Sequence, residues 1–171
     1  EVELHAPGEL GFKVDVVDDS NAPMITAVAE AGPAAEWNAT CGPDEKLRVY
    51  DCILEIGGKS VVAGNMAPVV SSLSPGKVLM KLRRPQTRIA LFQKTSELGV
   101  NMVYKKSSSG ILIKSISPHG LVSQHNEAYP ENAMDVGDRI VGLNDELLPA
   151  AELVEKVRNM NNFSFKFMHY G

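Results

Sequence analysis

Two stretches of the sequence nearly repeat one another 88 positions apart, ELGF at 9–12 and ELGV at 97–100. Further pairs continue the pattern: Gly32 with Gly120, Asn38 with Asn126, and, at an offset of 87, Asp51 with Asp138. A single-residue deletion accounts for the change of offset. Because self-similarity at a fixed spacing is the mark of a duplicated structural unit, we predict two domains, residues 1–85 and 86–171.

Composition limits the possible functions of such a chain. It is 44% hydrophobic and 22% charged, as in ordinary globular proteins, and no apolar run approaches the roughly 20 residues of a membrane-spanning helix. Residues 1–86 hold 8 basic and 12 acidic side chains, and residues 87–171 hold 9 of each. Neither half therefore offers the basic face that nucleic acid or an anionic membrane requires.

Cysteine usage says something about the compartment. Two cysteines, Cys41 and Cys52, both lie in the first half, and two are too few for a disulfide framework. Two free thiols are the favoured interpretation, with a single bridge as the alternative. This usage argues against a secreted protein.

The hydrophobic pattern is mostly that of β-strands. Strands are expected at 11–17, 51–59 and 77–84 in the first repeat and at 111–117, 138–146 and 163–170 in the second. Two of them run into turn sequences, Gly57-Gly58 and Asn144-Asp145. Helices are expected at 33–40, 65–73, 120–128 and 149–160, with Asn65 as an N-cap. The fold class is therefore mainly β, with two helices in each unit.

This order of elements, with ELGF before the second strand and MDVGDRIVGLND at 134–145, resembles a PDZ domain. The resemblance covers nearly the whole chain, twice, and implies two tandem PDZ-like domains, each a β-sandwich or partly open barrel. The helix and loop sequences at 36–40 and 124–133 are similar to those of PDZ domains from dinoflagellate algae. In the first repeat Tyr50 replaces the glycine that the family has before Asp51.

PDZ domains bind extended peptide ends by strand addition, so the resemblance implies a groove in each repeat. In the first repeat it falls on Leu10, Gly11, Phe12, Val14, Met66, Val70 and Leu73. In the second it falls on Leu98, Gly99, Val100, Met102, Ala150, Val154 and Val157. The Leu-Gly turn would direct backbone N–H groups at a carboxylate, and the same apolar residues would otherwise serve simply as core.

Two features of the groove bear on its specificity. Met66 and Ala150 stand where many PDZ domains place a histidine that bonds a Ser or Thr hydroxyl, so a hydrophobic-x-hydrophobic peptide terminus is expected. Glu9 and Glu97 lie beside the turn, where a carboxylate repels a bound carboxylate unless it points away. Of the two repeats, only the second has a basic residue, Lys94, just upstream.

Catalytic and metal chemistry find little support in the sequence. GGKS at 57–60 lacks the first glycine of a phosphate-binding loop, and SPGK at 74–77 is a turn sequence rather than a buried Ser-Lys pair. The four histidines are scattered without ligand spacing, and nothing pairs a cysteine with one of them. We expect no enzyme, cofactor or metal site.

Two functions fit these observations. One is a scaffold whose two modules hold the C-terminal or internal extended segments of protein partners. The other is a peripheral subunit, with degenerate grooves, of a large complex. An algal plastid photosystem with its antenna is the host that the narrower resemblance implies. Trp37, the single tryptophan, would anchor an interface in the second case or cap its own core.

Overall fold

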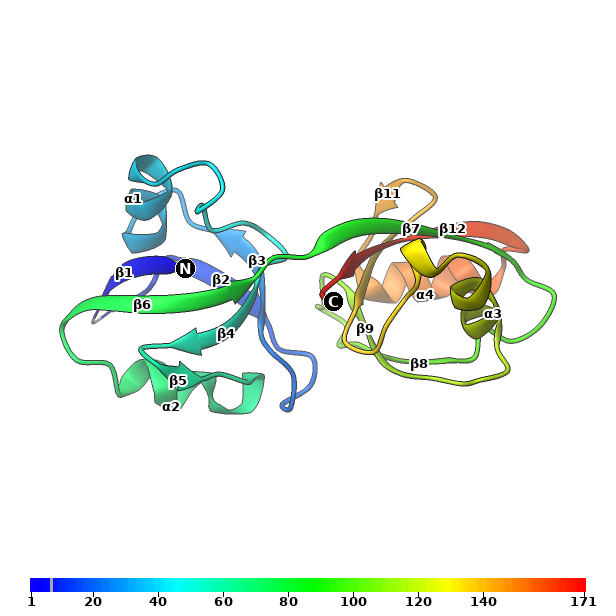
Figure 1. Ribbon diagram of the computed structural model, residues 1–171, viewed down its shortest axis with the longest axis horizontal. Helices are drawn as coiled ribbons and strands as arrows, with labels where there is room; N and C mark the ends of the chain where they lie inside the picture. The colour runs from blue at the N-terminus through cyan, green and yellow to red at the C-terminus, as the bar shows by residue number, and fades with distance from the viewer. Residues whose placement is uncertain (7) are drawn as a thin grey trace. The chain divides into compact units, whose positions relative to one another are not determined.

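The computed structural model describes residues 1–6 and 8–171, and the chain divides into two compact units, Glu1–Arg84 and Pro85–Gly171. The predicted boundary lies one residue later. Each unit is built on its own antiparallel sheet with two α-helices (Figure 1). The predicted fold class, mainly β with two helices per unit, is confirmed.

Unit 1 contains the predicted strands and helices, together with strands at Val2–Ala6 and Met24–Val28 that were not assigned from the sequence. Its elements are β1 (Val2–Ala6), β2 (Phe12–Asp15), β3 (Met24–Val28), α1 (Pro33–Thr40), β4 (Cys52–Ile56), β5 (Lys59–Ser60), η1 (Ala63–Asn65), α2 (Met66–Ser71) and β6 (Gly76–Arg83). The strands lie in the order β1-β6-β4-β3-β2, with β5 paired to β4. The first and last strands of the unit are therefore neighbours, and β2 lies at one end of the sheet.

Unit 2 repeats this arrangement. Its elements are β7 (Gln86–Gln93), β8 (Val100–Val103), β9 (Ile111–Ile116), α3 (Leu121–Ala128), η2 (Pro130–Asn132), β10 (Arg139–Leu143), β11 (Glu146–Leu147), α4 (Ala150–Arg158) and β12 (Asn162–His169). The order is β7-β12-β10-β9-β8, with β11 paired to β10. Unit 2 likewise contains its predicted strands and helices, and β7 and β8 are strands that were not assigned from the sequence.

The turn chemistry seen in the sequence fixes the hairpins after β4 and β10. Gly57 and Gly58 have φ values of 57° and 75°, and Asn144 and Asp145 have 49° and 68°. Positive φ at both central residues defines a type I′ turn, which Gly, Asn and Asp adopt most readily. Both predicted turns are confirmed.

Each unit buries its own hydrophobic core. In unit 1 the buried cluster comprises Val2, Leu4, Leu10, Ile25, Leu47, Ile53, Ile56, Val61, Val78 and Met80. In unit 2 it is richer in aromatic residues and includes Phe92, Phe163, Phe165 and Phe167. Trp37 packs against the first cluster, and its Nε1 donates to the Glu45 carbonyl at 3.0 Å. The tryptophan is therefore engaged within unit 1.

An asparagine clamp recurs in both units and locates the deletion. Asn38 donates to the Leu47 carbonyl at 2.9 Å and accepts from the Leu47 amide at 2.7 Å. Asn126 makes the same two bonds to Met134, at 2.7 and 2.9 Å. The hydrogen-bonded residues are nine positions apart in the first clamp and eight in the second. The residue missing from unit 2 therefore lies in the loop between Asn126 and Met134.

A buried aspartate before β4 and β10 also recurs, but the side chain that contacts it differs. Asp51, 1% exposed, accepts from Arg84 Nε and Nη2, both at 3.0 Å. Arg84 also donates to the carbonyls of Asp44 and Lys46, and the hydrogen bond to Asp51 raises the pKa of Arg84. In unit 2, His169 Nδ1 lies 3.0 Å from Asp138 Oδ2.

One predicted N-cap, Asn65, is confirmed in its position but not in its hydrogen bonding. Asn65 stands at the N-cap of α2, yet its side chain makes no bond to the helix amides. Its Oδ1 instead accepts from the Val62 amide at 2.9 Å, and its Nδ2 donates to the Ser60 carbonyl at 3.1 Å. The side chain is therefore committed to the turn that precedes the helix.

Candidate functional site

The second strand of each unit offers a free edge. Among the described strands, β2 pairs with β3 alone and β8 with β9 alone. The Gly11 carbonyl accepts from the Ala29 amide at 2.8 Å, just before the Phe12–Val28 pair. Since the C=O of one residue and the N–H of the next point in opposite directions across a peptide plane, the Phe12 N–H faces away from β3.

In the turn before β2, the N–H of Gly11 is also directed away from its neighbouring elements. The Leu10 carbonyl accepts from the Ala34 amide at the start of α1, at 3.1 Å. The same reasoning therefore turns the Gly11 N–H outward. Two successive N–H groups on one open side make a nest for an anionic or carbonyl oxygen.

Unit 2 has the same turn. The Leu98 carbonyl accepts from the Val122 amide at 3.0 Å, and the Gly99 carbonyl accepts from the Ser117 amide at 2.7 Å. Gly99 has φ of 68°, and a Cβ there would lie 2.5 Å from the Gly120 Cα. Only glycine allows this approach.

A cavity of about 680 Å³ opens beside β2 in unit 1. Its lining residues are Gly8, Glu9, Leu10, Gly11, Phe12, Lys13, Ala27, Val28, Ala29, Glu30, Met66 and Val70. Five of the seven residues predicted for this groove are therefore brought together around one cavity. The other two, Val14 and Leu73, are partly buried against the core of the unit. The cavity combines the outward amides of the turn with an apolar slot.

The cavity also has residues that the sequence reasoning did not name. Ala27, Val28, Ala29 and Glu30 come from the end of β3 and the residues after it. Val28 is the cross-strand partner of Phe12, so the two side chains share a face of the sheet. The apolar run MITAV at 24–28 was the signal for this strand, but its register against β2 was not readable from the sequence.

The equivalent region of unit 2 is arranged differently. Ala150 is 0% exposed and Val157 6% exposed, so both lie in the core, whereas Val154 is partly exposed. The Ala150 amide donates to the Ser108 carbonyl at 3.1 Å. Three further predicted residues, Leu98, Val100 and Met102, are partly buried against the same core. Of the helix residues predicted for this groove, Val154 is the one left accessible.

Charge also distinguishes the two regions. Glu9, Lys13 and Glu30 line the cavity of unit 1. Their counterparts in the repeat are Glu97, Asn101 and Pro118. In unit 2, Lys94 Nζ donates to the Arg158 carbonyl at 3.1 Å, at the last residue of α4. Unit 2 therefore has one carboxylate fewer at these positions, and its Lys94, at the end of α4, takes the place of the lysine that Asn101 replaces.

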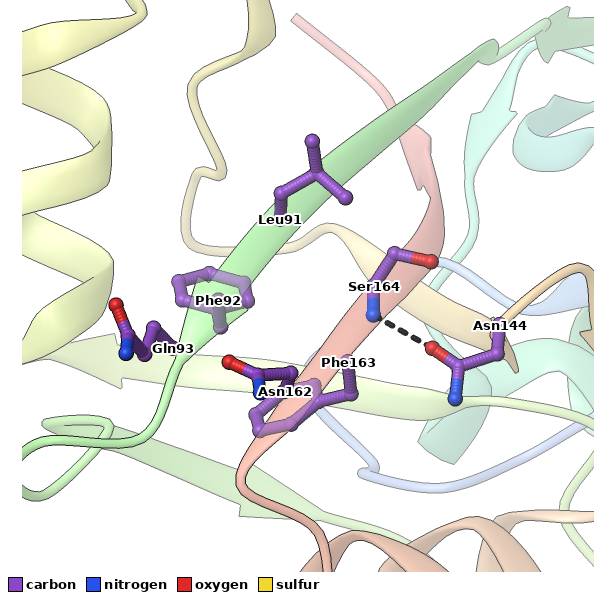
Figure 2. Close-up of a pocket in the computed structure, with 7 residues that line it drawn as sticks. All are labelled: Leu91, Phe92, Gln93, Asn144, Asn162, Phe163 and Ser164. Carbon is purple, nitrogen blue, oxygen red and sulfur yellow. Dashed lines mark hydrogen bonds between the residues drawn. The ribbon is translucent and has the colours of Figure 1, made fainter.

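A second hollow, of about 520 Å³, lies on unit 2 away from the predicted groove. Figure 2 shows its lining residues: Leu91, Phe92, Gln93, Asn144, Asn162, Phe163 and Ser164. They come from β7, β12 and the turn after β10, and the Ser164 amide donates to Asn144 Oδ1 at 2.8 Å. Sequence reasoning assigned no site here.

Other features bear on the wider function. The longest α-helix in the described part of the chain has nine residues, and no described helix is long and apolar enough to cross a membrane. Cys41 and Cys52 are not joined by a disulfide. Burial raises the pKa of Tyr50, the residue that holds a φ of 76° where unit 2 has Gly137.

Known proteins offer the following similarities. No protein-family model matches the sequence. The nitrogen fixation protein FixI of Rhizobium meliloti (strain 1021) is 33% identical over 70 residues, which cover 39% of this chain and 9% of FixI.

Similar solved structures are PDZ domains. The structure of INAD PDZ45 in complex with NG2 peptide covers 98% of this chain and 87% of its own, with 16% identity and a TM-score of 0.43. A choanoflagellate SHANK1 PDZ domain bound to GIRK3 peptide covers 49% of this chain and 92% of its own, with 13% identity and a TM-score of 0.41. A choanoflagellate GIPC PDZ domain covers 49% and 90%, with 15% identity and a TM-score of 0.40.

Proposed function

We propose that the chain is a non-catalytic protein-interaction module that binds extended peptide segments by adding them as a strand to β2 and β8. The observation that supports this proposal best is in unit 1. There the outward Phe12 amide, on a free sheet edge, lies beside an apolar cavity lined by Met66 and Val70. Main-chain hydrogen bonds along such an edge provide affinity, and the adjoining cavity provides selection of side chains.

The side chains around the cavity favour apolar ligands. Met66 begins α2 and lines the cavity, and its thioether cannot serve as a strong hydrogen-bond partner for a hydroxyl. Phe12 and Val28 add apolar surface on the sheet side. Side chains of a strand alternate between its two faces. A bound peptide with a hydrophobic residue at every second position would therefore direct all of these hydrophobic side chains toward α2.

The proposal is tested by titrating the whole chain with labelled hydrophobic-x-hydrophobic peptides. Val70→Arg would fill the groove of unit 1, and Val154→Arg, at the corresponding position of α4, would fill that of unit 2. We expect dissociation constants in the micromolar range, on the order of −8 kcal/mol, and loss of one binding event with each substitution. Binding unchanged in the double variant would contradict strand addition at these grooves.

Two modules in one chain support a scaffold role. If both grooves bind, two linked segments of one partner would bind with higher avidity than either alone. A peptide with two copies of the binding segment, compared with one copy, measures this effect. Equal affinity for both peptides would restrict the chain to a single working groove.

A second candidate function is that of a peripheral subunit in a large complex, and β7 is the observation that favours it. Ile89 is 46% exposed and Leu91 74% exposed on this strand, and Leu91 borders the hollow in Figure 2. Contiguous exposed apolar side chains often mark a protein–protein contact. A subunit would stay in a large complex through dilution and salt, and Ile89→Lys with Leu91→Lys would release it. Rapid exchange of partners would instead favour the scaffold.

A further inference from the structure

We propose that unit 1 selects an internal extended segment with a Lys or Arg after its apolar anchor, in preference to a free C-terminal carboxylate. The inference rests on the proposed function, because it concerns the same cavity. It assigns the choice of ligand to two side chains that the strand-addition argument does not use, Glu9 and Glu30.

Both carboxylates belong to residues next to the segments that form the turn with the outward amides. Glu9 immediately precedes Leu10 and Gly11 in the turn. Glu30 immediately follows Ala29, whose amide is bonded to the Gly11 carbonyl at 2.8 Å. Glu9 and Glu30 are both exposed and both line the cavity. A ligand group that reaches the Gly11 and Phe12 N–H groups would therefore bind in a cavity whose lining carries two acidic side chains.

Nothing within the described residues neutralises these two groups. No ion pair or hydrogen bond joins either Glu9 or Glu30 to another residue that the structure describes. Lys13, the single basic residue of the lining, is on β2 one position beyond Phe12. Because neighbouring residues of a strand point to opposite faces, its side chain leaves the strand on the face opposite Phe12. The amide end of the cavity is therefore acidic.

This charge arrangement separates two kinds of ligand. A free terminal carboxylate bound at the amides would be repelled by two like charges. A backbone carbonyl of a continuing chain accepts the same hydrogen bonds without a formal charge. The residue that follows it reaches Glu9 and Glu30, and a Lys or Arg there would lay its aliphatic stem on the apolar lining and its charge beside the carboxylates.

Unit 2 provides the contrast within the same chain. Glu97 corresponds to Glu9, but Pro118 stands where unit 1 has Glu30. Lys94 is anchored to the Arg158 carbonyl at the end of α4. With one carboxylate fewer, the turn of unit 2 disfavours a free terminus less. The groove of unit 1 would therefore prefer an internal peptide segment, whereas the groove of unit 2 would accept a free C-terminus more readily.

The test uses the whole chain with Val154→Arg to fill the second groove, and Val154→Gln should that variant not fold. Three labelled peptides share a Val-Ser-Val anchor. The first ends there as a free acid, the second continues with Arg-Gly-Gly and an amide, and the third has Glu in place of Arg. We expect the Arg peptide to bind about tenfold more tightly than the free acid, and the Glu peptide to bind most weakly.

Glu9→Gln combined with Glu30→Gln should reduce the Arg preference to about twofold or less, with Glu97→Gln as the control that leaves it intact. High salt should reduce the preference in the same direction, because exposed charges are screened. A free acid that binds best in both the parent and the double Gln variant would overturn the inference while leaving strand addition standing. Absence of binding by all three peptides would overturn both.

Discussion

The buried aspartate of each unit is bonded by a different side chain, Arg84 in unit 1 and His169 in unit 2. The comparison indicates that the fold retains the aspartate but accepts more than one partner for it. Arg84 bonds both oxygens of Asp51 and two carbonyls of the preceding loop. His169 contacts a single oxygen of Asp138, while the Tyr170 amide donates to the other at 3.2 Å. A carboxylate at this place appears in both units, and its partner is free to change.

The same contrast holds for the clamp and the turn. Asn38 and Asn126 make identical pairs of backbone bonds, and Gly11 and Gly99 both have positive φ. By comparison, the helix residues Met66 and Ala150 differ in size and exposure. Residues that satisfy backbone groups have been kept across the duplication, whereas residues that face the grooves have diverged.

The largest effect is expected where two glycines touch in unit 2 only. In Gly120→Ala the new Cβ would lie 2.3 Å from the Gly99 Cα, which should destabilise the unit by about 3 kcal/mol or more. Gly32→Ala, its counterpart in unit 1, meets nothing within 4 Å and adds only the strain of a φ of 94°, about 1–2 kcal/mol. Urea denaturation followed by circular dichroism compares the two. Equal losses would show that the close glycine contact is unimportant.

Next in size is the removal of the cation in unit 1. Arg84→Ala leaves the buried Asp51 carboxylate without its cation and with only the Arg48 amide, which donates at 3.0 Å, a change that should cost about 3 kcal/mol. His169→Ala should cost less, about 1–2 kcal/mol, because one hydrogen bond is lost and the Tyr170 amide remains. Trp37 is the only tryptophan, so its fluorescence follows unfolding of unit 1 specifically.

The exposed ion pair between Lys77 and Glu3, at 2.7 Å, provides a control for the Arg84→Ala and His169→Ala variants. Lys77→Ala should change stability by no more than about 1 kcal/mol, since exposed pairs contribute little. A His169→Ala variant that loses as much stability as Arg84→Ala would break the proposed distinction between the two units.

The asparagine clamps should give nearly equal effects. Asn38→Ala and Asn126→Ala each remove a donated and an accepted hydrogen bond to one backbone residue, at a cost of about 2 kcal/mol. Thermal denaturation of both variants, with Trp37 fluorescence as the signal for unit 1, compares them. A difference greater than about 1 kcal/mol would show that the shorter loop of unit 2 changes the contribution of its clamp.

The smallest effect is expected at the residue before the buried aspartate. Gly137→Ala places a Cβ in open space at a φ of 98°, which should cost about 1 kcal/mol. Tyr50 shows that a side chain at this position can be accommodated, since it holds a φ of 76° in unit 1. Loss of several kcal/mol, measured by urea denaturation, would contradict this comparison.

Sequence reasoning was most successful where a residue type has one conformational use. The Asn144-Asp145 turn and the helix at 33–40 occur where they were predicted. The duplicated Asp and Asn residues bond the backbone, and the duplicated glycines have a positive φ or, as at Gly99 and Gly120, allow close approach of the backbone. Local signals of this kind need no knowledge of distant parts of the chain.

Groove geometry was less predictable because it depends on packing between elements far apart in sequence. Ala150 and Val154 share one helix face, yet one is fully buried and the other is not. Glu30 lines the cavity only because of how β3 pairs with β2. The side chain of Asn65 could have bonded either the first amides of α2 or the preceding turn, and it bonds the Val62 amide and the Ser60 carbonyl of that turn.

The pairing of β1 with β6 has a consequence for how the chain is made. Val2 lies opposite Met80, so the first strand has no partner within its unit until the last strand of that unit has been synthesised. At about 5–20 residues per second, that interval lasts roughly 4–16 seconds on the ribosome. During that time the backbone N–H and C=O groups of β1 that later pair with β6 are exposed, and such unpaired strand edges favour misfolding and aggregation.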